Sequence, residues 1–182
     1  MRQEDKSKIY KLVMTGVFAA LLAVFSQISI PMPTGVPVTL QTFAVALCAY
    51  VLGWKLGVLA VTVYLALGAV GLPVFSGFGA GVGTFLNVTG GFLWGFLLMA
   101  LLCGLGTQTE KPVLAIPSGI LGLLLCHVCG VLQFAVLSGN PFWESLLLVS
   151  APYLLKDAVS VALAYPAAKA VRFSLRKAKL TG

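Results

Sequence analysis

Residues 85–106 read FLNVTGGFLWGFLLMALLCGLG and contain no charged side chain. A helix of about 20 apolar residues is long enough to cross the hydrocarbon core of a bilayer. Pro, Gly and charged residues separate this run from five other apolar runs, at residues 12–30, 38–53, 56–72, 113–138 and 146–171. The pattern predicts an all-α membrane protein in which six transmembrane helices form a single domain over residues 1–182.

The composition supports the same class. Of the 182 residues, 59% are hydrophobic and 9% are charged, and the mean hydropathy is +1.02. Because 12 Lys and Arg and 5 Asp and Glu are too few to cover a soluble surface, a DNA-binding protein, a disulfide scaffold and a cytosolic catalytic domain are excluded. The runs at 38–53 and 56–72 are short for a bilayer, so we expect the neighbouring Pro/Gly-rich stretches to fold back into the protein.

The basic residues indicate an orientation in the membrane. An even number of spans places both termini on one side, and the three loops of the opposite side then contain no Lys or Arg. The positive-inside rule therefore assigns the basic side to the cytoplasm, and the net charge of +7 is no sign of a nucleic-acid partner. The residues on this side are Arg2, Lys6, Lys8, Lys11, Lys55, Lys111, Lys169, Arg172, Arg176, Lys177 and Lys179.

The first run also resembles a secretory signal. Val24 and Ser26 form a small-residue cleavage site before Gln27, after a basic start and an apolar stretch. Cleavage would leave five spans and place the two ends of the mature chain on opposite sides, which fits the charge pattern poorly. We therefore expect the first run to be a transmembrane helix.

Two uncharged loops on the outer side are rich in Pro or Gly. The first, IPMPTGVPVTLQT at residues 30–42, is stiffened by three prolines. Gln41 lies about one turn inside the apolar helix that is expected to follow, and its amide suits a helix–helix hydrogen bond and a ligand contact equally. The loop at residues 71–84 alternates glycines without the Lys-Ser/Thr of a phosphate-binding loop. It is interpreted as a lid or pocket wall, with a flexible turn as the alternative.

Two charged residues lie inside the last run. Lys156 and Asp157 each cost about 2.5 to 3.5 kcal/mol in a membrane helix, so such residues commonly mark a functional site. Neighbouring residues point about 100° apart on a helix, so we expect these two to meet different partners. A self-contained ion network between helices is the alternative.

Two shorter patterns have less specific meanings. Cys126, His127 and Cys129 resemble a zinc pattern, but the two cysteines share a helix face that excludes the histidine, so buried thiols are expected instead of a metal site. In the first run, small residues recur four apart as Gly16/Ala20 and Ala19/Ala23. This spacing permits close helix packing, either within the chain or against another protein.

Three stretches together resemble a known family. They are PVTLQT at residues 37–42, YLALGAVGLPVFSG at 64–77 and TGGFLWGF at 89–96. The combination is similar to the BioY family, which comprises the biotin-binding S components of energy-coupling factor (ECF) transporters. The resemblance covers essentially the whole chain and is densest over residues 31–96.

The resemblance implies an S-component fold of six helices, with both termini in the cytoplasm, in a prokaryotic plasma membrane. It implies a biotin site on the outer side, closed by the first and third loops. It also implies that Ala19 and Ala23 dock on a transmembrane T component, which engages two cytoplasmic ATPases. Because the chain has no P-loop, those partners would hydrolyse the ATP, and the chain is expected to be a non-enzyme without cofactor or metal.

The resemblance and the chemistry of biotin together suggest a ligand site. Many family members carry Asp-x-x-Lys in the sixth helix, whereas here the third residue after Asp157 is Ser160 and the lysine is Lys156. Asp157 is expected to accept a hydrogen bond from a ureido N–H, and Lys156 to contact whichever end of biotin lies deepest. The other expected contacts are the donors Gln41, Asn87 and Thr89 and the ring walls Tyr64, Phe75 and Tyr153.

Two other functions compete with substrate capture. A stand-alone or proton-coupled transporter of a vitamin or small acid would use Asp157 to carry the proton. An intramembrane enzyme would need a nucleophile with a base or metal within reach, which the few ionisable residues of the apolar runs do not suggest.

Overall fold

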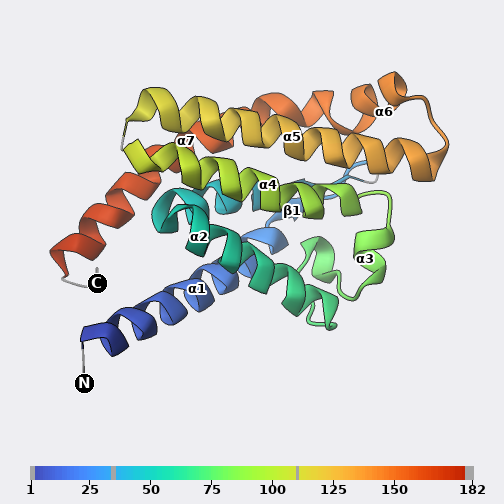
Figure 1. Cartoon of the computed structure of the whole chain (residues 1–182). Coiled ribbons are helices and arrows are strands. Elements are labelled where there is room, and N and C mark those ends of the chain that lie inside the picture. The colour runs from blue at the N-terminus through green and yellow to red at the C-terminus, as the bar shows by residue number, and fades with distance from the viewer. Residues whose placement is uncertain (1–2, 34–35, 110, 179–182) are drawn as a thin grey trace.

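The computed structural model describes residues 3–33, 36–109 and 111–178, and it is a bundle of helices (Figure 1). Arg2 and Lys179, which the prediction places on the cytoplasmic side, lie outside the described residues, as do the loop residues Thr34 and Gly35. The elements are α1 (Gln3–Gln27), β1 (Ser29–Ile30), β2 (Val38–Thr39), α2 (Gln41–Ala69), η1 (Ser76–Phe78), α3 (Gly83–Leu86), α4 (Gly90–Gly106), η2 (Thr107–Thr109), α5 (Pro112–Ser138), α6 (Phe142–Val149) and α7 (Ala151–Lys177).

The predicted all-α class holds except for one small ladder. Strands β1 and β2 pair antiparallel, with Ser29 opposite Thr39 and Ile30 opposite Val38. The proline-rich loop between them is therefore the tip of a short hairpin. The hairpin lies between α1 and α2, where the sequence predicted a loop.

Helix α2 folds back on itself at Gly53, where the backbone leaves the helical region with φ 76° and ψ 175°. The side chains of Gln41 and Tyr64 are joined by a hydrogen bond of 2.7 Å, although residues so far apart in a straight helix would be separated by about 35 Å. Gly57 also packs directly on Ala49, since a Cβ at Gly57 would lie 2.8 Å from the Ala49 Cα. The two arms, 41–52 and 54–69, correspond to the second and third predicted runs.

Several helices are apolar enough for a membrane. Among the described residues, three helical stretches could each cross a membrane by length and composition, and a fourth could if α6 and α7 are one bent span; the three are Ser7–Gln27, Gln41–Ala69 and Pro112–Ser138. Helix α4 is apolar but shorter. Because α2 folds back at Gly53, its length is divided between two shorter arms.

The last run is broken, whereas the sequence predicted one helix over 146–171. Helices α6 and α7 meet at Ser150 with a bend of 53°. Pro152 lies in the first turn of α7, where its missing N–H removes no helical hydrogen bond. Lys156 and Asp157 therefore lie in the second turn of α7, and not ten residues inside a straight helix.

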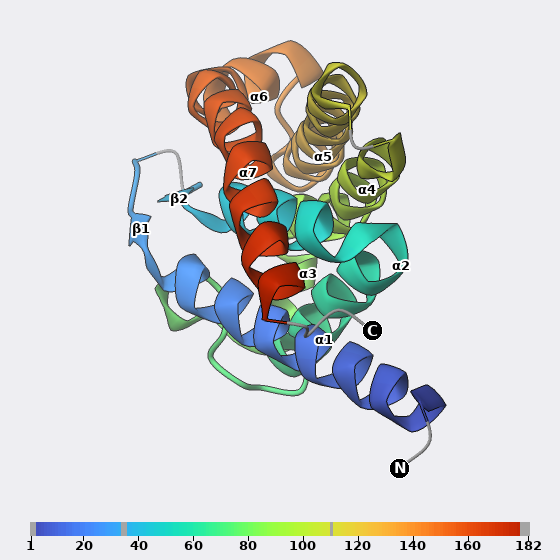
Figure 2. The ribbon, with the colours of Figure 1, turned by 90° about the vertical axis from the view of Figure 1, so that its left-hand side faces the viewer.

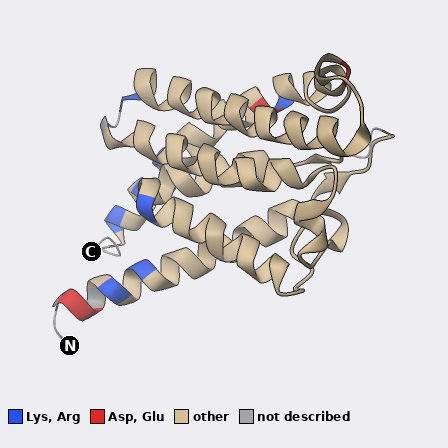
Figure 3. Ribbon diagram, turned by 45° about the vertical axis from the view of Figure 1, so that its right-hand side comes forward, with Lys and Arg blue, Asp and Glu red and all other residues tan. Residues whose placement is uncertain are grey.

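Helix α2 lies at the centre of the bundle, between α1 and the pair α4 and α5, and α7 packs on α2 and α5 (Figures 1 and 2). The start of α1 and the end of α7 lie at the same end of the molecule, where most Lys and Arg gather (Figure 3). The hairpin, α3 and α6 lie toward the opposite end. The bundle therefore has one basic end and one end built from loops.

Candidate functional site

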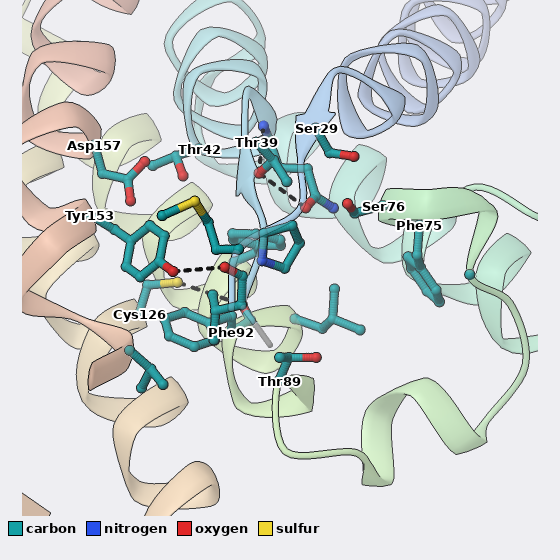
Figure 4. Close-up of a pocket in the computed structure, with 18 of the residues that line it drawn as sticks. Ser29, Thr39, Thr42, Phe75, Ser76, Thr89, Phe92, Cys126, Tyr153 and Asp157 are labelled. Atoms are coloured by element: carbon teal, nitrogen blue, oxygen red, sulfur yellow. Dashed lines mark hydrogen bonds between the residues drawn. The ribbon is translucent and has the colours of Figure 1, made fainter. Parts of the chain in front are cut away.

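A cavity of about 590 Å³ lies at the loop end of the bundle. Its walls come from the β1–β2 hairpin, the segment 75–89, and helices α4, α5 and α7. In Figure 4, Asp157 and Tyr153 approach the cavity from one side and Phe75 from the other, with Thr39 between them. The volume falls within the range of about 300 to 1,000 Å³ that is usual for small-molecule sites.

Two side chains of α7 hold the hairpin over the cavity. The Tyr153 hydroxyl donates to the Val36 carbonyl at 2.8 Å, and Lys156 Nζ donates to the Thr39 carbonyl at 2.8 Å. Pro31 and Pro37 line the cavity in the same hairpin, and their fixed φ angles limit how far this loop can rearrange. The first loop is thus a cavity wall tied to α7.

The glycine-rich loop supplies the opposite wall. Phe75 is 2% exposed, and its ring packs edge-on against the rings of Tyr64 and Phe85, each at 5.5 Å. A Cβ at Gly68 would lie 2.0 Å from the Phe75 ring, so only glycine leaves room for it. The interpretation of this loop as a pocket wall agrees with its position.

A cluster of polar groups, buried except for Lys156, lies where α7 meets α5. Lys156 Nζ lies 2.5 Å from Asp157 Oδ1, and His127 Nε2 lies 3.4 Å from Asp157 Oδ2. The other ring nitrogen of His127 is 2.8 Å from the Ser150 hydroxyl, and Thr42 lies beside Asp157 (Figure 4). The expectation that Lys156 and Asp157 do not pair with each other is wrong, because the flexible lysine side chain bends back across the 100° between the two positions. Each also has a separate partner, the Thr39 carbonyl for Lys156 and His127 for Asp157.

Each oxygen of Asp157 has a different neighbour. Asp157 Oδ1 is buried and is paired with the Lys156 ammonium group, whereas Oδ2 lies nearest to His127 Nε2. A carboxylate has about four acceptor positions, so it can accept more bonds than these two neighbours supply. Asp157 lines the cavity, and it therefore retains acceptor capacity for a ligand N–H.

The residues predicted to contact the ligand surround this cavity, with one exception. Tyr64 is fully buried behind the wall, where its hydroxyl accepts a hydrogen bond from Gln41 Nε2. Gln41 both makes this helix–helix bond and lines the cavity, so the two interpretations of its amide are compatible. The predicted contact residues that line the cavity are Gln41, Phe75, Asn87, Thr89, Tyr153, Lys156 and Asp157. The roles of these residues in binding remain predictions.

The sequence did not identify several residues that line the cavity. His127 is the most informative of these, because its sequence context suggested only a metal ligand or a buried residue, whereas it lines the cavity. Its position inside an apolar run was itself a signal, since ionisable residues in membrane helices tend to be functional. Thr42, Phe92 and Cys126 gave no such signal, because only the packing of α2, α4 and α5 brings them to the cavity.

The predicted docking residues of α1 face inward. Ala19 is 1% exposed, and Ala23 is partly buried against the same core. Ala19 therefore presents no surface to a partner in this structure. Gly16 and Ala20, the other small pair, lie on the exposed face of α1, and no other residue lies within 4 Å of the place of a Cβ on Gly16.

An apolar helical bundle with a ligand-sized, mainly apolar cavity at its loop end, lined by a few polar groups, defines a membrane protein built around a small-molecule site. The chain belongs to the BioY family, which matches it over residues 1–177.

Curated relatives agree with this family. The biotin transporter BioY of Thermotoga maritima is 46% identical over 66% of this chain and 72% of its own length. The probable biotin transporter BioY of Pyrococcus horikoshii is 35% identical over 86% of this chain and 93% of its own. The biotin transporter BioY2 of Lactococcus lactis subsp. cremoris is 36% identical over 87% and 88%.

A solved structure shares the fold. The crystal structure of the S component for biotin from an ECF-type ABC transporter matches with a TM-score of 0.82. The match covers 94% of each chain at 24% sequence identity. The chain therefore has the fold of an S component.

Proposed function

We propose that this chain is the biotin-binding S component of an ECF transporter and not an enzyme. It captures biotin on the outer side of a prokaryotic plasma membrane and delivers it together with a T component and two cytoplasmic ATPases. Membership of the BioY family, the S-component fold and the names of the relatives support this function. The chain uses no cofactor of its own, and its partners hydrolyse the ATP.

The Lys156–Asp157 pair at the cavity is the observation that carries the proposal. A ureido group has a carbonyl acceptor flanked by two N–H donors, so it matches an ammonium donor beside a carboxylate acceptor. A ligand carboxylate at the same place would meet the negative charge of Asp157. The ureido ring therefore lies against the pair, with an N–H directed at the Asp157 carboxylate.

The remaining walls suit the rest of biotin. Tyr153 lies near Asp157 and Phe92 lies beside Cys126, and their rings provide apolar surface for the sulfur ring (Figure 4). Thr89 lies across the cavity, and Asn87 belongs to the same segment, so these two can donate hydrogen bonds to the valerate carboxylate. Gln41 also lines the cavity and retains donor capacity after its bond to Tyr64.

We further propose six membrane crossings, with the two arms of α2 as the second and third. The basic end, which holds the start of α1 and the end of α7, faces the cytoplasm, and the cavity faces outward (Figure 3). Docking on the T component uses the exposed face of α1, which includes Gly16 and Ala20, in place of the buried Ala19. Membrane lipid covers the other exposed apolar faces.

Uptake of labelled biotin into proteoliposomes tests the proposal against proton-coupled transport. The proposal predicts uptake only when the T component and both ATPases are present and ATP is enclosed with the ATPases. Uptake by the chain alone, abolished by an uncoupler, would instead support a carrier in which Asp157, next to His127, moves the proton.

A further inference from the structure

Two glutamine side chains attach residues 75–87, which comprise most of the glycine-rich loop and the residues after it, to the helices. Gln27, the last residue of α1, contacts the first half of this stretch, and Gln133 of α5 contacts the second half. Neither glutamine lines the cavity. Both bind loop backbone atoms, so their effect on the cavity is exerted through the loop.

Gln27 bridges the turn that carries Phe75. Its Nε2 donates to the Phe75 carbonyl at 3.0 Å, and its Oε1 accepts from the Phe78 N–H at 3.1 Å. These partners fix the orientation of the amide, because a carbonyl only accepts and an N–H only donates. The neighbouring Ser26 adds a hydrogen bond to the Val74 carbonyl.

This turn needs external support. Phe78 has φ 59°, in the left-handed region that residues with a side chain rarely adopt. Such a conformation persists only where surrounding contacts hold it. The Phe78 side chain is 71% exposed and packs little, so the bond from its N–H to Gln27 is a main support of the turn.

Gln133 makes a comparable bridge at the other half. Its Nε2 donates to the Phe85 and Asn87 carbonyls, both at 2.7 Å. The two bridges differ in how tightly the helix that carries each glutamine is packed in the bundle. Helix α5 packs against α4, α6 and α7, whereas α1 packs mainly on α2 and leaves Val13, Val17 and Val24 exposed.

We propose that Gln27 is a positioning residue for the ligand cavity. It holds the Phe75 wall closed and ties that wall to α1, the least enclosed of the long helices. Gln133 independently holds the Phe85 half to the bundle interior. A displacement of α1 therefore loosens one wall of the cavity and leaves the other in place.

Amide hydrogen exchange of the purified chain without ligand tests the bridge directly. Gln27→Met keeps the side-chain length but removes both bonds, and it should speed exchange over residues 76–79 while leaving 85–90 unchanged. Gln133→Met should give the reverse pattern. The control is Gln108→Met, at an exposed glutamine in η2, which should change neither segment. Unchanged exchange over 76–79 in folded Gln27→Met would overturn the proposal.

Biotin dissociation gives a second readout, which rests on the proposed function. With two hydrogen bonds lost, Gln27→Met should speed dissociation about five- to thirtyfold and change the association rate much less. An unchanged dissociation rate would also overturn the proposal. If Gln27→Met does not fold, Gln27→Asn, which withdraws the amide by one methylene, takes its place in both readouts. If the wild-type chain binds no biotin, the proposed function fails, and hydrogen exchange alone decides the role of Gln27.

Discussion

Asp157 combines deep burial with close polar neighbours. A carboxylate that is 6% exposed in an apolar bundle is tolerated only with compensation, which Lys156 and His127 provide. A carboxylate has about four acceptor positions, so these neighbours leave acceptor capacity on the side of the cavity. Such a carboxylate is suited to bind a ligand with N–H groups.

Replacing Asp157 tests this role. Asp157→Asn removes the charge and turns part of the acceptor into a donor, so biotin affinity should fall at least about tenfold, since charge-assisted bonds contribute about 1.5 to 3 kcal/mol. Titration calorimetry on the folded variant measures the change. Asp5→Asn, at an exposed aspartate in the first turn of α1, is the matched control. Unchanged affinity in Asp157→Asn would remove Asp157 from the site.

Lys156 permits a test of which end of biotin lies at the ion pair. If the ureido ring lies there, Lys156→Met should weaken biotin and biotin amide by the same factor, because the amide differs only at the valerate end. Competition binding with both ligands measures the two factors, with Lys55→Met at an exposed lysine as the control. A loss confined to biotin would place the carboxylate at Lys156 and contradict the proposed orientation.

Sequence reasoning found most polar residues of the site and missed their pairing. Asp157 and Gln41 were identifiable because polar side chains in apolar runs are few. The 2.5 Å contact of Lys156 with Asp157 was not predicted, because helical angles between neighbours ignore the reach of a lysine side chain. The contact between His127 and Asp157 depends on the packing of α5 against α7, which no local pattern encodes.

At the scale of elements, the fold-back of α2 brings distant polar residues together. Gly53 allows the reversal, and the two arms then place Gln41 beside Tyr64. The second arm also contacts the Phe75 ring at Gly68, where no side chain is in the way. One turn therefore helps to build two sides of the cavity.

Gly53 should tolerate no side chain. Its φ of 76° and ψ of 175° fall in a region that only glycine adopts readily, so Gly53→Ala should destabilise the protein by about 1 to 3 kcal/mol. Gly16→Ala is a matched control, since neither glycine has another residue within 4 Å of its added Cβ, and alanine favours the helix at residue 16. Thermal unfolding in detergent should show a lower Tm for Gly53→Ala only. Equal Tm values for the two variants would contradict this account of the turn.

Hydropathy located the apolar runs, but it did not locate every break in a helix or show which helix face is buried. The two arms of α2 agree with two predicted runs, because Gly53 and Lys55 interrupt the apolar sequence between them. The break at Ser150 was missed, since residues 146–155 are continuously apolar except for that serine. The inward direction of Ala19 depends on which side of α1 meets α2, and two equivalent small-residue spacings left that undecided.

At the scale of the whole molecule, charge and cavity are separated. Basic residues gather where α1 starts and α7 ends, and the cavity lies among the loops at the other end (Figures 1 and 3). Helix α1 reaches from the basic end to the glycine-rich loop, where Ser26 and Gln27 bind the backbone. The molecule thus has a structural connection between its partner-facing helix, as proposed, and its ligand site.

Biotin binding by the purified chain alone tests the central claim most directly. Calorimetry in detergent, without ATP or partner proteins, should show tight binding of one biotin per chain. Desthiobiotin, which keeps the ureido ring, should compete, and thiamine should not. A folded chain that gives no binding signal with biotin would contradict the account, and the BioY family would then describe the fold of this protein but not its ligand.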